Sequence, residues 1–156
     1  MRADLYTQVH RGGYLDLVRY RPCWLLVQPD GSLSRHLGPT RTARIGHALE
    51  AGHGLVRVRL GARFGGVAWT TADVNRPPNP VGACLLLSLG APWRAIDGPV
   101  AVTGWGEGIR GLRLCQVRAV EALHTDIVSA LHGRAAGDHP AGWAAEVRGF
   151  AAYAMR

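Results

Sequence analysis

The chain has 156 residues, of which 47% are hydrophobic and 19% charged, a balance that favours one folded domain and excludes a disordered chain. All 18 basic side chains are arginine, which excludes functions that need a lysine, such as a phosphate-loop lysine or a Schiff base. The formal net charge is +7, and such an excess permits attraction to nucleic acid or another polyanion.

The first predicted elements are two strands followed by a short helix. The apolar run CWLLVQ at 23–28 suits a buried strand, and the PDGS turn that follows lets SLSRHL pair back as a second strand. The segment RTARIGHALEA at 41–51 fits a helix. We expect Thr40 or Thr42 to cap this helix and Gly52 to end it.

The middle of the chain predicts another strand pair, a buried helix and a further strand. LVRVRL at 55–60 alternates apolar residues with arginine, which is typical of a strand with one face in water, and VAWTT after Gly65 and Gly66 is its expected partner. Asn79 is a suitable N-cap for a helix that ends near Gly90, with Pro80 in its first turn. PVAVT at 99–103 then predicts a short strand.

Helices are predicted for the last third of the chain. Apolar residues recur at helical spacing from Val117 to Leu131, and a second helix is expected from about Asp138 onward. The fold class expected from this order is α+β: a small, mainly antiparallel sheet covered by short helices, with a C-terminal helical extension. We expect residues 1–133 to form the α+β domain and 134–156 to form the C-terminal helix.

Two features suggest chemistry, and each has a plainer explanation. The glycines of 106–111 match G-x-G-x-x-G, but Glu107 and the lack of later strands favour a glycine-rich turn over a dinucleotide site. Cys84 is a candidate nucleophile, but its apolar surroundings favour an inert buried thiol. The cysteines and histidines are scattered without metal-ligand spacing, so we expect no metal and no cofactor.

The arginines are the best candidates for function. Arg57 and Arg59 are two apart on one predicted strand and therefore share a face. A wider patch is expected from neighbouring segments, with Trp69 as a stacking surface, so the predicted nucleic-acid site comprises Arg35, Arg41, Arg44, Arg57, Arg59 and Trp69. A solvated sheet face is the more frequent explanation of such a pattern.

The order of four segments resembles a family of small proteins from bacteriophages, plasmids and actinobacterial or firmicute genomes, which is catalogued as a domain of unknown function. These segments are LLVQPDGSL, LVRVRL, PPNPVGACLLL and DGPVAVTG. Asn79 and Ala83 match the characteristic positions of its "N-x-x-A" segment. The resemblance implies an accessory role in a mobile element and brings no catalytic residue with it.

The sequence thus favours a non-enzymatic binding or regulatory protein whose partner is a protein or a nucleic acid. Two alternatives stay open: a small enzyme that uses Cys84 with a histidine, and an interaction module that presents Trp143 and Phe150 on the last helix. No signal peptide or membrane span is predicted, so we expect a cytoplasmic protein.

Overall fold

The computed structural model describes residues 22–73 and 75–132. Its sheet has six antiparallel strands in the order β2-β1-β5-β4-β3, with β6 paired to β5. The strands are β1 (Cys23–Val27), β2 (Leu33–Leu37), β3 (Leu55–Arg59), β4 (Gly66–Thr71), β5 (Val100–Trp105) and β6 (Ile109–Arg110). The helices are α2 (Thr42–Ala48), α3 (Pro80–Ser88) and α4 (Leu114–His132). The α+β class with an antiparallel sheet is therefore confirmed.

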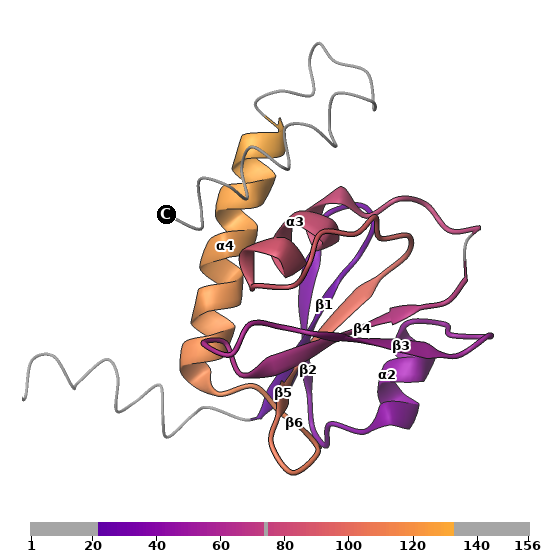
Figure 1. Ribbon diagram of the computed structural model, residues 1–156, viewed down its shortest axis with the longest axis vertical. Coiled ribbons are helices and arrows are strands. Elements are labelled where there is room, and N and C mark those ends of the chain that lie inside the picture. The colour runs from indigo at the N-terminus through magenta and orange to yellow at the C-terminus, as the bar shows by residue number, and fades with distance from the viewer. Residues whose placement is uncertain (1–21, 74, 133–156) are drawn as a thin grey trace, which may run out of the picture.

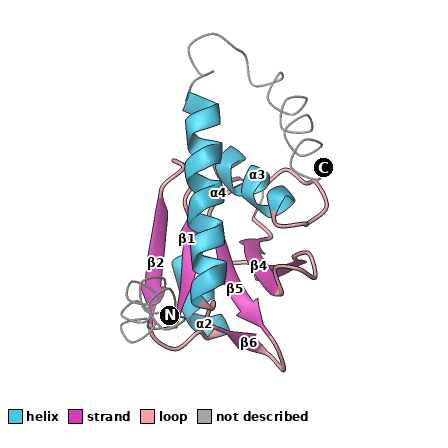
Figure 2. Cartoon of the chain, turned by 90° about the vertical axis from the view of Figure 1, so that its left-hand side faces the viewer, coloured by secondary structure: helices cyan, strands magenta, loops and turns pink. Residues whose placement is uncertain are grey.

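The two faces of the sheet are covered unequally (Figures 1 and 2). Helices α3 and α4 pack on one face, where the larger core contains Leu25, Val58, Val102 and the buried side of α4. On the other face the short helix α2 places Ile45 and Leu49 against Trp24 and Leu26. We call these the α3–α4 face and the α2 face.

Helix α3 is apolar on nearly every side, and the reason is its position. It packs against the sheet and also contacts α4, so residues on several sides of it are buried. A helix that is enclosed in this way does not need a polar stripe. Asn79 is its N-cap and Pro80 its first residue, as the sequence predicts, and Gly90 follows the C-cap Leu89 with a φ of +88°.

The prediction for the ends of helix α2 was wrong. Its N-cap is Arg41, whose side chain makes no capping hydrogen bond, and neither Thr40 nor Thr42 takes this role. The helix ends at Ala48 with Leu49 as C-cap, four residues before Gly52. The chain turns at Glu50 instead, which has a φ of +50° although it is not glycine.

Arg76 provides contacts that hold this unusual turn. Its guanidinium donates hydrogen bonds to the carbonyl oxygens of Leu49 and Glu50, and it also pairs with the carboxylate of Asp73. Glu50 therefore keeps a left-handed backbone because a side chain from a distant segment binds its carbonyl group. No local sequence signal marks this arrangement.

Several predictions concern residues outside the described part of the chain. The helix expected from about Asp138 onward, the division at residue 133, and the partner-binding candidates Trp143 and Phe150 all belong there. They stay predictions.

Candidate nucleic-acid interface

The strand register decides which arginines share a face. Arg57 pairs with Trp69 across β3 and β4, and Arg59 pairs with Val67, so all four side chains lie on the α2 face. Arg57 and Arg59 are exposed, and no carboxylate within residues 22–73 and 75–132 forms an ion pair with either. The predicted pair of arginines on one strand face is therefore present.

Trp105 at the end of β5 joins these arginines, although the sequence analysis did not select it. The guanidinium carbon of Arg57 lies 4.8 Å from the centre of a Trp105 ring, which is the geometry of a cation–π contact. Trp105 is partly exposed and also contacts Trp69, with ring centres 6.5 Å apart and a tilt of 50°. We call Arg57, Arg59 and Trp105 the β3 patch.

Trp69 does not have the position that the sequence suggested. It is only 8% exposed, and its indole N–H donates a 3.0 Å hydrogen bond to the hydroxyl of Thr103. A ring that is buried and held in this way supports its neighbours but offers little surface for stacking. Trp105 takes the exposed position because it follows Thr103 by two residues and therefore lies on the same face near the end of the sheet.

Arg35 lies on the opposite face from the β3 patch. It pairs with Leu25 across β1 and β2, so it faces α4, where its Nε and one terminal nitrogen donate to the two carboxylate oxygens of Glu121 at 2.6 and 2.7 Å. This bidentate ion pair joins the edge strand to the long helix. Arg35 therefore does not widen the patch of Arg57 and Arg59.

Arg41 and Arg44 lie on the α2 face but near the other edge of the sheet. Arg44 donates to the carbonyl oxygen of Pro39, just beyond β2, and burial together with the charge of Arg44 lowers the pKa of His36 on that strand. Strands β2 and β3 are the two ends of a five-strand path, and strand spacing places them about 19 Å apart. The predicted single patch is thus two basic groups on opposite edges.

The remaining chemical candidates have structural roles in the described part of the chain. Cys84 is 5% exposed, and burial raises its pKa from 9.0 to about 11, which opposes thiolate formation. Residues 106–108 form the turn between β5 and β6, and Gly111 directly follows β6, so the glycine motif lies in a hairpin rather than at a helix start. No group of three or more metal-ligand side chains occurs in residues 22–73 and 75–132. Among those residues, no helix is both long and apolar enough to cross a membrane.

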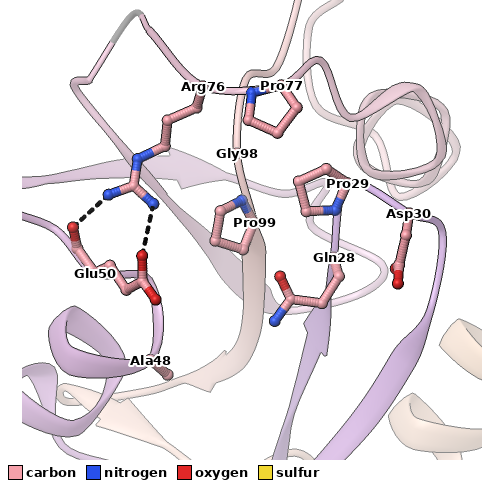
Figure 3. A pocket seen from close by; sticks show the side chains of 9 residues that line it. All are labelled: Gln28, Pro29, Asp30, Ala48, Glu50, Arg76, Pro77, Gly98 and Pro99. Carbon is pink, nitrogen blue, oxygen red and sulfur yellow. Dashed lines mark hydrogen bonds and ion pairs between the residues drawn. The ribbon is translucent and has the colours of Figure 1, made fainter.

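A depression lies at the end of the sheet where β1 and α2 end and β5 begins (Figure 3). It measures about 750 Å³ and is lined by Gln28, Pro29, Asp30, Ala48, Glu50, Arg76, Pro77, Gly98 and Pro99. The guanidinium of Arg76 donates hydrogen bonds to the carbonyl oxygens of Leu49 and Glu50 there, so both of its terminal nitrogens already have partners within the protein. We interpret this depression as the surface of a structural junction.

Asn79 lies beneath this junction and is fully buried. Its amide nitrogen donates to the carbonyl oxygens of Val27 and Gly98, at 3.1 and 2.9 Å, and its amide oxygen accepts from the N–H of Gly82 at 2.8 Å. One side chain therefore joins the end of β1, the segment before β5 and the start of α3. These are three of the four segments on which the family resemblance rests.

No family model, curated protein or solved structure matches the chain. The family resemblance therefore stays a prediction, and the function is argued from the geometry.

Proposed function

We propose that this protein is a non-enzymatic binding protein that takes nucleic acid on the β3 patch. The observation that carries the proposal is the pair of exposed arginines, Arg57 and Arg59, which share a sheet face with an aromatic ring and have no carboxylate partner in the described part of the chain. Guanidinium groups bind phosphate oxygens through forked hydrogen bonds, and an adjacent aromatic ring binds bases. A regulatory role in a phage- or plasmid-like element rests on the family resemblance and belongs to the same proposal.

The positive charge at the two edges of the sheet supports a negatively charged polymer as the partner. Arg41 and Arg44 add positive charge on the α2 face near β2, so an approaching phosphate chain meets the same sign of charge at both edges. Arg35 is excluded from this argument because Glu121 neutralises it on the other face. Clustered charge of one sign accelerates the encounter of oppositely charged molecules.

The proposal is tested by titrating fluorescently labelled DNA and RNA of about 20 nucleotides with the protein at about 50 mM salt. We expect binding that Arg57→Gln and Arg59→Gln each weaken about 3- to 10-fold, because each loses one phosphate contact. The slope of log K against log salt is negative, and each substitution is expected to make it less steep by about 0.7 to 0.9.

Arg94→Gln is the matched control, since Arg94 is exposed in the loop between α3 and β5 and the substitution removes the same charge. We expect this variant to bind nearly as the parent protein does. No binding to any of these nucleic acids, or an equal loss in all three variants, would show that the β3 patch is not a nucleic-acid site.

A further inference from the structure

We infer that the β3 patch selects single-stranded over double-stranded nucleic acid and holds one base stacked on the Arg57–Trp105 pair. This inference rests on the proposed function and names the form of nucleic acid that the same site takes. The inference follows from the contacts among Trp69, Trp105 and Arg57 and from the shape of the α2 face around them.

The first observation is a chain of contacts between three flat groups, Trp69, Trp105 and Arg57. Trp69 is fixed by its hydrogen bond to Thr103, the partly exposed Trp105 leans against it, and Arg57 lies over a Trp105 ring. Unstacked bases bind both aromatic rings and guanidinium planes. The side of the exposed Arg57 group that faces away from Trp105 is therefore suited to a base, and the hydrogen-bonded Trp69 supports the Trp105 ring beneath it.

The second observation is the position of Arg59 beside this stack. It is two residues further along the same edge strand, about 6.6 Å away at the usual rise of a strand, and its side chain is exposed. A base on the Arg57–Trp105 pair would leave its own or the next phosphate group near Arg59. Stacking beside a basic group is the arrangement by which proteins bind single strands without reading their sequence.

The third observation concerns duplex nucleic acid, which the shape of this face disfavours. The major groove of B-DNA is about 12 Å wide and admits a helix or a two-stranded ribbon, whereas this sheet is about 19 Å across its five-strand path. Helix α2 also packs on the same face and projects from it (Figure 1). A duplex can present only its outer phosphates to the β3 patch, and its paired bases cannot stack on the Arg57–Trp105 pair.

The test compares one labelled strand of about 20 nucleotides with the same strand annealed to its complement, at equal salt. We expect the single strand to bind at least about tenfold more tightly, because only an unpaired base gains the stacking contribution. Trp105→Ala is expected to weaken single-strand binding about 5- to 100-fold and to leave duplex binding unchanged. Trp93→Ala, which removes an exposed tryptophan from the loop after α3, is the matched control and should change neither.

Two conservative variants keep the test decisive if Trp105→Ala does not fold, as judged by circular dichroism. Trp105→Phe should retain most of the single-strand affinity because it keeps an aromatic ring. Arg57→Lys should lose single-strand affinity but keep duplex affinity, because lysine retains the positive charge but lacks the planar guanidinium group on which a base stacks. Equal affinity for both forms, or equal effects of these variants on both, would overturn the inference and leave the proposed function standing. Binding of neither form would instead overturn the proposed function itself.

Discussion

Asn79 shows how much one buried side chain can connect. Its amide donates two hydrogen bonds to carbonyl groups of other segments and accepts one from Gly82 at the start of α3. The fit is close, because a side-chain carbon on Gly82 would lie 2.9 Å from Asn79. Capping was the predicted role of Asn79, and that role is confirmed, but two of its three side-chain contacts are tertiary.

Substitution of Asn79 separates these two roles. Aspartate caps helices as well as asparagine does, but it cannot donate to the carbonyl oxygens of Val27 and Gly98. We therefore expect both Asn79→Asp and Asn79→Ala to lower the free energy of unfolding by about 2–4 kcal/mol, measured by urea denaturation. Asn75→Asp, a control at an exposed position, should change it by less than about 0.5 kcal/mol. If Asn79→Asp were as stable as the parent, the cap alone would explain this residue.

Cys84 illustrates a residue whose chemistry depends on its surroundings. Its sequence context is compatible with either a nucleophile or a packed thiol. Burial in the core beneath α4 raises its pKa, and the thiol is then a poor source of thiolate at neutral pH. The packing role that the apolar neighbours favour agrees with this environment.

Among the helices, α2 is short, and no N-cap side chain accepts a hydrogen bond from the backbone N–H groups of its first turn. Arg41 has the extended backbone of an N-cap, with a φ of −130° and a ψ of 143°, but its side chain makes no capping hydrogen bond. The first turn also contains no acidic residue to interact with the helix dipole. Packing of Ile45 and Leu49 on the sheet must therefore hold this helix in place.

Arg41→Ser is expected to stabilise the protein by about 0.5–1 kcal/mol, because a serine hydroxyl at the N-cap accepts a hydrogen bond from the first turn. Urea denaturation measures this gain. Arg44→Ser removes the same charge from the middle of α2 and serves as a control, which should be neutral or destabilising. A loss of stability in Arg41→Ser would mean that the arginine has a contact more valuable than a cap.

Strand β3 and its neighbours show what register adds to a strand prediction. The alternation in LVRVRL predicts correctly that Arg57 and Arg59 share an exposed face. It contains no information about which strand lies next to β3 or on which side Arg35 falls. The neighbour of β3 follows from the strand order, and the face of Arg35 follows from the register that pairs it with Leu25.

At the scale of the whole molecule, the pKa shifts of three described groups contribute to the change of stability with pH. A hydrogen bond from Ser32 lowers the pKa of Asp30, and burial together with Arg44 lowers the pKa of His36, so both groups bind protons more readily in the unfolded chain. The contribution of His36 is present above pH 6.5 and is lost as the pH falls below that value, whereas the contribution of Asp30 is lost only as the pH falls below 3.8. Cys84 acts in the opposite direction, because the unfolded chain releases its proton first.

We therefore expect the free energy of unfolding to be greatest between neutral pH and about pH 9, and to fall as the pH rises from 9 toward 11. Urea denaturation at a series of pH values measures this profile. Cys84→Ala should flatten the alkaline decline relative to the parent, whereas Cys115→Ala, at an exposed thiol, should leave it unchanged. An alkaline decline of the same size in Cys84→Ala would assign it to other groups.

The sequence by itself determined the elements of this protein: both strand pairs, the Asn79–Pro80 start of α3, the long C-terminal helix of the described region and the α+β class. Turn chemistry, capping and apolar periodicity are local properties, so a single chain is enough to predict them. Only the tertiary structure decided that Arg35 and Arg57 lie on opposite faces, that Trp105 rather than Trp69 is the exposed ring, and that Arg76 holds the turn at Glu50. Each of these depends on strand register or on contacts between residues far apart in the chain, and such distances leave no local pattern.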